Sequence, residues 1–384
     1  MAYQIKLPSC AYGGEGSMRQ ITEIIQKENT KRIAIFTDEG LKEAGLVSLL
    51  TDELDCTSVR YRIFSECKPE PTYGQVEDVI EKAREFDCDL IVGIGGGSVM
   101  DAAKLASVLK GASYTLQDLM ENPAQAQKMV KTVMIPSTCG TGAEATCNAI
   151  VAIPEENSKK GIVNDNMIPD YVILEPRMIA GLPKNIVAAT GVDALAHAVE
   201  CYTSKKATPF SDGYALMAAK LIFGNIREAY EHPDNMEAKS NMMLGAYYGG
   251  IAITGSGTTA VHALSYPLGG KYHIAHGVSN AILFSHVMEF NMDACENRLA
   301  QICDVIHPAY AKKTTGEKAQ YVIAQISDIV KVTNIPTDLA GYGVTVDDVE
   351  FLVAAGSRQQ RLLVNNPKEL SLEDIRTLYL KVIK

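Results

Sequence analysis

The sequence lacks the features that mark membrane, secreted or repeat proteins. The best apolar candidate for a membrane span is interrupted by Asp101 and Lys104, so no run reaches spanning length. There is no internal repeat or low-complexity tract, and residues 1–6 lack the apolar core of a signal peptide. We therefore expect a cytoplasmic protein.

Paired cysteines and an excess of positive charge are also absent. The nine cysteines are odd in number and form no C-x-x-C pair, which argues against a disulfide framework or a structural zinc site. The formal charge of −10 argues against nucleic acid or anionic membranes as general partners. Small acidic substrates stay possible, because local potential can differ from net charge. A length of 384 residues suggests two domains, each with its own core.

The first half of the chain predicts alternating strands and helices. Short apolar runs at residues 33–37, 58–64, 90–94 and 132–136 read as strands, and residues 41–50, 73–86 and 98–110 have helical spacing. This rhythm predicts a twisted parallel sheet covered by helices.

The second half predicts helices alone. We expect helices at residues 192–202, 213–229, 237–253, 258–265, 292–303, 317–332, 346–357 and 372–383. The class of structure changes near Pro183. We therefore predict an α/β domain over residues 1–182 and an all-helical domain over residues 183–384.

A glycine-rich turn joins the strand at 90–94 to the helix after it. In Gly93-Ile94-Gly95-Gly96-Gly97-Ser98, glycines would let a phosphate approach the backbone at a helix N-terminus. The turn departs from the G-x-G-x-x-G fingerprint at Ser98, and a tight turn without a ligand is the alternative. Its position between strand and helix favours a diphosphate site. Asp38, after an earlier strand, could hold a ribose 2′-hydroxyl.

A second polar loop, residues 136–144, follows the next strand. Ligands of open α/β sheets collect at the carboxyl ends of strands, so Thr138 and Thr141 could line the same nucleotide site. Simple hydrogen bonding within the loop is the alternative.

Four residues in the second half could bind a metal ion. Asp193 and His197 would project from one face of a helix at i and i+4, and His262 and His276 follow later. A surface pair and two core histidines are the alternative. The nearly uncharged residues 251–270 indicate that His262 is buried, and a buried polar group needs a partner.

These motifs, in this order, resemble the iron-containing (group III) alcohol dehydrogenase family. The resemblance rests on Gly95-Gly96-Gly97-Ser98 with Asp101, on residues 136–142, on residues 191–197 and on His276-Gly277, and it runs along nearly the whole chain. It implies a dehydroquinate synthase-like fold: a Rossmann-like α/β nucleotide-binding domain, an all-helical domain and an active site between them.

The resemblance also implies roles for individual residues. The implied metal ligands are Asp193, His197, His262 and His276. The implied cofactor residues are Asp38, Gly95, Gly96, Gly97, Ser98, Asp101, Thr138, Thr141 and Lys160.

Three positions depart from the family pattern. Tyr266 stands where many members have a second histidine, Glu70 where many have asparagine, and Ala143 where serine is frequent. His273, three residues before an implied ligand, is our hypothesis for a substitute catalytic proton carrier.

The implied activity is reversible hydride transfer between NAD(H) and a small primary alcohol or its aldehyde, by a homodimer or higher homo-oligomer. The ion would be Fe²⁺, with Zn²⁺, Mn²⁺ or Ni²⁺ equally suited to the ligands, and would act as a Lewis acid on the substrate oxygen. Asp38 would favour NAD over NADP by charge repulsion. Residues 254–272 would shape the substrate pocket.

Two alternatives remain open. A lyase of the dehydroquinate synthase type would need basic residues for its substrate, and the sequence shows only Lys271 around His262 and His276. A nucleotide-binding protein without catalysis would not need the intact ligand set.

Overall fold

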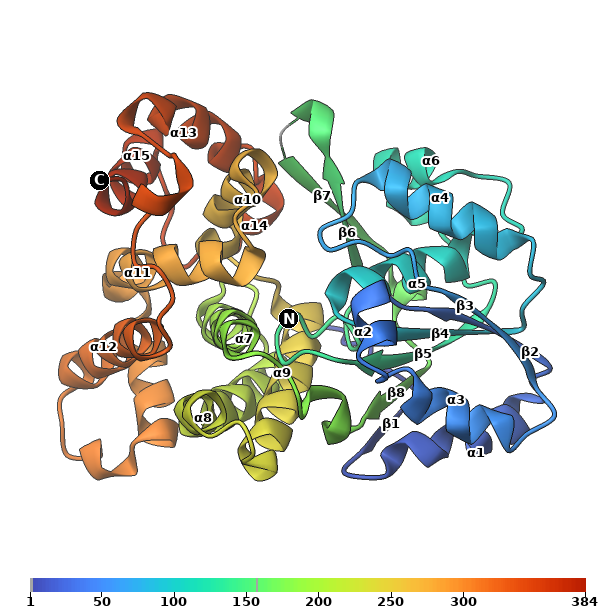
Figure 1. Ribbon diagram of the computed structural model, residues 1–384. Helices are drawn as coiled ribbons and strands as arrows, with labels where there is room; N and C mark the ends of the chain where they lie inside the picture. Colours follow the sequence, from blue (N-terminus) through green and yellow to red (C-terminus); the bar gives the residue numbers. More distant parts are fainter. Residues whose placement is uncertain (1–2, 157) are drawn as a thin grey trace.

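The computed structural model describes residues 3–156 and 158–384. Figure 1 shows two parts side by side, a sheet covered by helices and a group of helices. The six-stranded sheet has the order β1-β8-β5-β4-β2-β3, and all its neighbouring strands are parallel. Its strands are β1 (Cys10–Gly13), β2 (Arg32–Phe36), β3 (Arg60–Phe64), β4 (Leu90–Gly95), β5 (Lys131–Pro136) and β8 (Tyr171–Leu174).

Each face of the sheet is covered by its own helices, as Figure 1 shows. On β2, Ile33 and Ile35 pack with α1 (Gln20–Glu28) and α3 (Ser48–Asp55). Ala34 and Phe36 point the other way, towards α4 (Tyr73–Arg84), α5 (Gly97–Leu109) and α6 (Leu116–Glu121). Successive side chains of a strand alternate between faces, so a strand buried on both faces is apolar throughout.

A two-stranded antiparallel hairpin lies between the two parts (Figure 1). Its strands are β6 (Asn148–Ile153) and β7 (Ser158–Val163). Ala149, Val151 and Ile162 pack into the core formed with α4 and α5, while β7 also contacts α10 of the helical part. Both parts of the chain therefore reach this hairpin.

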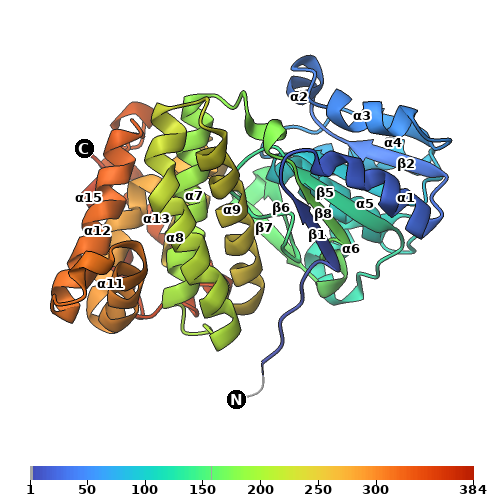
Figure 2. The same ribbon diagram turned by 90° about the horizontal axis from the view of Figure 1, so that it is seen from below.

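The long helices of the second part run side by side in Figure 2. The helices are α7 (Lys184–Thr203), α8 (Pro209–Glu231), α9 (Met236–Ser256), α10 (Ala260–Tyr272), α11 (His276–Ile306), α12 (Thr315–Val332), α13 (Val349–Ser357), α14 (Gln360–Leu363) and α15 (Leu372–Val382). The expected α/β part followed by a helical part is confirmed. The predicted division at 182/183 falls in the connection between β8 and α7. No helix of the described residues is long and apolar enough to cross a membrane.

Several predicted helix bounds were wrong. Residues 41–50 form no single helix, because Gly45, with φ +71°, separates α2 (Glu39–Glu43) from α3. α7 begins at Lys184 and carries Gly191 inside it. A Cβ at Gly191 would lie 2.9 Å from side-chain carbons of Ile226 and Met242, so this glycine lets α8 and α9 approach α7.

The helices around the histidines also extend beyond their predicted ranges. α10 continues through Pro267 to Tyr272, seven residues beyond its predicted end at Ser265. α11 begins at His276, sixteen residues before its predicted start at Met292. His276 therefore stands in the first turn of a helix.

Candidate active site

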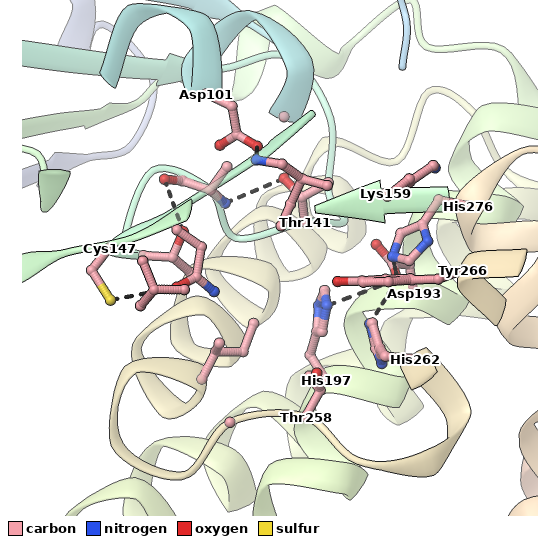
Figure 3. Close-up of a pocket in the computed structure, with 18 of the residues that line it drawn as sticks. Asp101, Thr141, Cys147, Lys159, Asp193, His197, Thr258, His262, Tyr266 and His276 are labelled. Carbon is pink, nitrogen blue, oxygen red and sulfur yellow. Dashed lines mark hydrogen bonds and ion pairs between the residues drawn. The ribbon is translucent and has the colours of Figure 1, made fainter. Parts of the chain in front are cut away.

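A cleft of about 490 Å³ lies between the sheet and the helical part. From the sheet part it is lined by the start of α5, the loop after β5 and the hairpin; from the helical part, by α7, α10, α11 and the segment 253–258. Figure 3 shows Asp101 and Thr141 on one side of it and the histidines on the other. The cleft therefore brings the glycine-rich turn and the metal candidates into one site.

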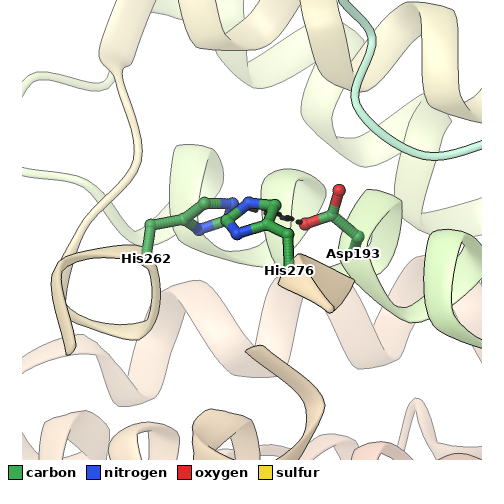
Figure 4. A group of neighbouring side chains, drawn as sticks. All are labelled: Asp193, His262 and His276. Carbon is green, nitrogen blue, oxygen red and sulfur yellow. Dashed lines mark ion pairs between the residues drawn. The ribbon is translucent and has the colours of Figure 1, made fainter. Parts of the chain in front are cut away.

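Three predicted metal ligands converge on one point, with Asp193 closest to both of the others. Asp193 Oδ1 lies 3.5 Å from Nε2 of His262 and 3.5 Å from Nε2 of His276. One potential ligand atom of each residue lies within 4.8 Å of the others, and Figure 4 shows the three side chains pointing together. These residues come from α7, α10 and α11.

His197 lies beside this group rather than at its centre. Its Nε2 is 3.9 Å from Asp193 Oδ1, and its ring stacks on that of His262 with centroids 4.6 Å apart. The buried Nδ1 of His197 has no hydrogen-bond partner among the described residues. The i, i+4 spacing thus brought Asp193 and His197 to one face of α7, as predicted.

The cluster is closed except on the side of His276. The side chains of His262, Asp193 and His197 are 3%, 4% and 6% exposed, whereas that of His276 is 26% exposed. An ion held here would thus be reachable from the cleft past His276. Such an open position is what separates a catalytic metal site from a structural one.

Burial and charge set the protonation of the four residues. Burial lowers the pKa of His197 to about 4 and that of His276 to about 3, so both rings are neutral and keep a lone pair for a metal. Burial opposes charge on His262, but the carboxylates of Glu200 and Asp193 raise its pKa to about 9. Although burial opposes its ionisation, the imidazoles around Asp193 hold its pKa well below the usual range. A divalent cation would replace the proton of His262.

Glu200 holds the ring of His262 from behind. Its carboxylate, fully buried, contacts Nδ1 of His262 and accepts from the backbone N–H groups of Thr259 (3.1 Å) and Val261 (2.8 Å). Nδ1 therefore keeps its proton, and Nε2, which faces Asp193, is the nitrogen that would exchange its proton for a metal ion. Glu200 was not predicted from the sequence, although a glutamate in the apolar run after Asp193 was a usable signal.

Asn280 was also missed. Its amide nitrogen donates to Asp193 Oδ1 (2.7 Å) and lies 3.3 Å from Nε2 of both His262 and His276. Its buried amide oxygen has no partner among the described residues. The amide NH₂ group of Asn280 thus lies near the point where the ligand atoms converge. One carboxylate and the imidazole nitrogens are a donor set that fits a divalent ion. The signal for Asn280 was its i+4 spacing from His276.

The glycine-rich turn forms the start of α5. Gly97 and Ser98 line the cleft, and the helix begins after Gly96 without a side-chain cap. A Cβ at Gly97 would lie 2.8 Å from the Thr141 side chain, so the glycine lets the two loops meet. The first N–H groups of α5 are therefore open to an anion.

Asp101 faces the cleft but is engaged by its own neighbours. It accepts from the backbone N–H of Ile150 (2.9 Å) and pairs with the buried Lys104 (3.0 Å). Its carboxylate therefore ties α5 to β6.

The other predicted cofactor residues follow the same edge of the sheet without lining the cleft. Asp38, Gly96 and Thr138 follow β2, β4 and β5, which are adjacent in the sheet, and Gly95 ends β4. Asp38 accepts from the N–H of Leu41 (2.9 Å) and caps α2.

The structure displaces the predicted lysine by one residue. Lys160 on β7 is exposed and does not line the cleft, whereas the side chain of Lys159 is 8% exposed and does. Alternate residues of a strand face opposite ways, so the shift reverses the direction of the side chain. Lys159 Nζ lies 3.0 Å from Glu70 Oε1, which also accepts from the backbone N–H of His276 (3.1 Å).

His273 does not reach the site. It is exposed, lies outside the cleft and ends α10 in the left-handed conformation, with φ 54° and ψ 29°. Its spacing from His276 predicted proximity, but the turn between the helices directs it outward. Tyr266 is the aromatic residue at the cluster: it is buried, lines the cleft and has its ring centroid 5.9 Å from that of His276.

The expected scarcity of basic residues was also wrong. Lys271 pairs with Asp348 (2.8 Å) and does not line the cleft, but Lys159, Lys206 and Arg361 do. These lysines and the arginine are distant in sequence from His262 and His276, so reading the neighbouring residues could not find them.

Comparison with known proteins agrees with this geometry. The family model for iron-containing alcohol dehydrogenase matches residues 8–176, and that for the C-terminal region of the same family matches residues 187–383. The chain is 34% identical to long-chain-alcohol dehydrogenase 1 of Geobacillus thermodenitrificans over 379 residues, covering 98% of this chain and 95% of that one.

Solved structures share the whole fold. A crystal structure of 1,3-propanediol oxidoreductase superposes with a TM-score of 0.93 at 28% identity, covering 100% of both chains. That of sulfoacetaldehyde reductase from Bifidobacterium kashiwanohense in complex with NAD⁺ gives 0.89 at 27% identity, covering 100% of this chain and 99% of that one. With both halves matched to one family and its fold reproduced along the whole chain, the protein belongs to the iron-containing alcohol dehydrogenase family.

Proposed function

We propose that this protein reduces a small aldehyde to its primary alcohol with NADH, and catalyses the reverse reaction, in the cleft between its two parts. One observation carries the proposal: Asp193, His262 and His276 converge in the same cleft as the open N-terminus of α5. A metal site and an anion-binding helix end facing one space suit a reaction between a nucleotide and a small polar substrate.

In this proposal Asp193, His197, His262 and His276 hold a divalent ion, Fe²⁺ or Zn²⁺. When bound, the ion would supply Lewis acidity at the substrate oxygen and NAD(H) would supply or accept the hydride. The residues around the site hold and orient the four metal candidates. Glu200 fixes the His262 ring, and Asn280 and Glu70 tie Asp193 and the backbone of His276 in place.

The cofactor diphosphate would lie at the start of α5, with Gly97, Ser98 and Thr141 around it. Support comes from the open N–H groups of the helix and from the close approach that Gly97 permits. The adenosine would then extend along the carboxyl edge of the sheet towards Asp38, whose charge would oppose a 2′-phosphate.

The relatives' names leave the substrate open. They point to a long-chain alcohol, 1,3-propanediol and sulfoacetaldehyde, which differ in length and charge. An alcohol or aldehyde as reacting group is their common feature, and the residues of this chain's own cleft would select the distal group. We also propose a cytoplasmic homo-oligomer; all nine cysteines are free, which suits a reducing compartment.

The test follows NADH absorbance anaerobically with a panel of aldehydes. Metal-stripped protein is compared with samples reloaded with Fe²⁺ or Zn²⁺, and Asp193→Asn serves as a variant with a weakened site. We expect turnover only in reloaded wild-type protein. NADH binding without turnover of any aldehyde, with either ion, would favour a non-catalytic nucleotide-binding protein and overturn the proposal.

A further inference from the structure

Two basic side chains in the cleft have no acidic partner. Of the other charged groups that line it, Lys159 pairs with Glu70, Asp101 pairs with Lys104, and Asp193 lies within the histidine cluster. Arg361 and Lys206 line the same cleft, and no carboxylate of the described residues lies within ion-pair distance of either. The cleft therefore holds two positive charges that no carboxylate of the described residues pairs with.

A hydrogen-bonded segment holds these two residues near each other. The side-chain amide of Asn365 donates to the carbonyl of Arg361 (3.2 Å) and to that of Thr258 (3.0 Å). The backbone carbonyl of Asn365 accepts from the N–H of Lys205 (2.8 Å), next to Lys206. Arg361 and Lys206 are thus fixed at the end of the cleft formed by the helical part.

The guanidinium of Arg361 rests on a glycine. A Cβ on Gly161 of β7 would lie 3.0 Å from Nη2 of Arg361 and 3.1 Å from a side-chain carbon of Ile150. The absence of a side chain at Gly161 therefore leaves room for the guanidinium between the hairpin and α14.

Arg361 also lies near Tyr266, which borders the metal candidates. The ring centroid of Tyr266 is 5.9 Å from that of His276, and burial raises the pKa of the Tyr266 phenol while the charge of Arg361 opposes that rise. Gly97 and Ser98, which would receive the cofactor diphosphate, come from the sheet part instead. A group bound by Arg361 would thus belong to the substrate.

We propose that the substrate aldehyde carries an anionic group, a carboxylate or a sulfonate, that Arg361 binds with help from Lys206. A guanidinium offers paired N–H donors that match the oxygens of such groups. Both residues are exposed, so their charged groups stay hydrated until a substrate arrives. The inference rests on the proposed function, because it assumes that the aldehyde end lies at the metal candidates.

The experiment compares anionic aldehydes with neutral ones of the same shape. 4-Oxobutanoate is paired with 4-methylpentanal, and 2-sulfoacetaldehyde with 3,3-dimethylbutanal, using metal-loaded enzyme and NADH. We expect wild-type kcat/KM to be at least about tenfold higher for one anionic member than for its neutral partner. The pair that shows the preference distinguishes a carboxylate from a sulfonate.

Two variants and one control locate the effect. Arg361→Gln should remove the preference by raising KM for the anionic aldehyde roughly ten- to hundredfold, with the neutral partner and NADH binding unchanged. Gly161→Ala keeps the charge but displaces the guanidinium, and should act in the same direction. Arg358 is an exposed arginine outside the cleft, so Arg358→Gln should leave kcat/KM unchanged for both aldehydes.

The possible failures can be told apart. If kcat/KM for the neutral aldehydes equals that for their anionic partners, this inference is overturned and the proposed function stands. The same holds if Arg361→Gln slows the reduction of both members of a pair equally. If no aldehyde of any kind is reduced, the proposed function fails and the inference with it.

Discussion

The carboxylate of Glu200 contacts Nδ1 of His262, while Nε2 of the same ring faces Asp193 Oδ1 at 3.5 Å. The buried carboxylate of Glu200 thus orients the ring, and the carboxylate of Asp193 lies beside the nitrogen that would bind the metal ion. Outer partners of this kind typically change metal affinity by about 10–100-fold when removed.

We therefore predict that Glu200→Gln lowers the affinity of the site for the metal ion by roughly that factor. An amide cannot hold the proton on Nδ1 as a carboxylate does, because it can also donate there. Competition with a chelator of known affinity measures the change, and Glu231→Gln, exposed at the end of α8, is the control. Unchanged metal affinity would show that packing alone fixes the His262 ring.

Lys159 and Lys160 give a matched pair of neighbouring charges. Lys159→Gln should lower kcat/KM about tenfold or more, because it removes a charge from the cleft and leaves Glu70 without its partner. Lys160→Gln removes the same charge from an exposed position on β7, outside the cleft, and should stay near wild type. Steady-state kinetics on both variants decide, and a larger effect at Lys160 would contradict the placement.

Asp38 combines a structural and an electrostatic role that two substitutions separate. Asp38→Gly and Asp38→Asn both remove the charge that would repel a 2′-phosphate, but asparagine can still cap α2. Both should raise kcat/KM with NADPH relative to NADH, while only glycine should lower thermal stability. If neither improves NADPH use, Asp38 does not face the adenosine ribose.

The burial of Glu144 should make the stability of the protein depend on pH. Burial raises the pKa of this carboxyl from its ordinary 4.5 to about 7, and its side chain is almost fully buried. The folded state then holds the proton more tightly than the unfolded chain, so stability is lost as pH rises from about 4.5 through 7. Glu144→Gln should be about 3 kcal/mol more stable than wild type near pH 8 and nearly equal near pH 4.5.

Urea unfolding at both pH values measures this difference, with the exposed Glu85→Gln as control. A stability gain that is the same at both pH values would show that the ionisation of Glu144 is not its cause.

His273→Ala should leave the pH–rate profile unchanged, since the side chain is exposed outside the cleft. His273→Gly should also raise stability, by about 0.5–1 kcal/mol, because glycine adopts the left-handed conformation at this helix end without strain. A shifted profile for both variants would restore His273 as the proton carrier.

What the sequence could predict depended on the range of each signal. The strand at 90–94, the glycine turn and the i, i+4 pair of Asp193 and His197 are local patterns, and their periodicity fixes where side chains point. The convergence of His262 and His276 with that pair came from family resemblance, because no local pattern reports how α7, α10 and α11 cross.

The misses have the same physical origin. Lys159 lines the cleft and Lys160 does not, because a one-residue shift on a strand reverses the face, and nothing nearby in the sequence fixed the register of β7. Arg361 and Lys206 come to the cleft from distant segments through the hydrogen bonds of Asn365. The predicted helix began just after Gly191, but Gly191 lies inside α7 and packs against Ile226 and Met242.

All four metal candidates belong to the helical part, on α7, α10 and α11. A bound ion would therefore act as a cross-link between α7 and the pair α10 and α11, which α8 and α9 separate from α7 in the chain. By mass action, free ion at a hundredfold excess over Kd would stabilise the folded protein by about 2.7 kcal/mol. Cellular supply of the ion would thus govern how much folded enzyme persists, as well as how fast it works.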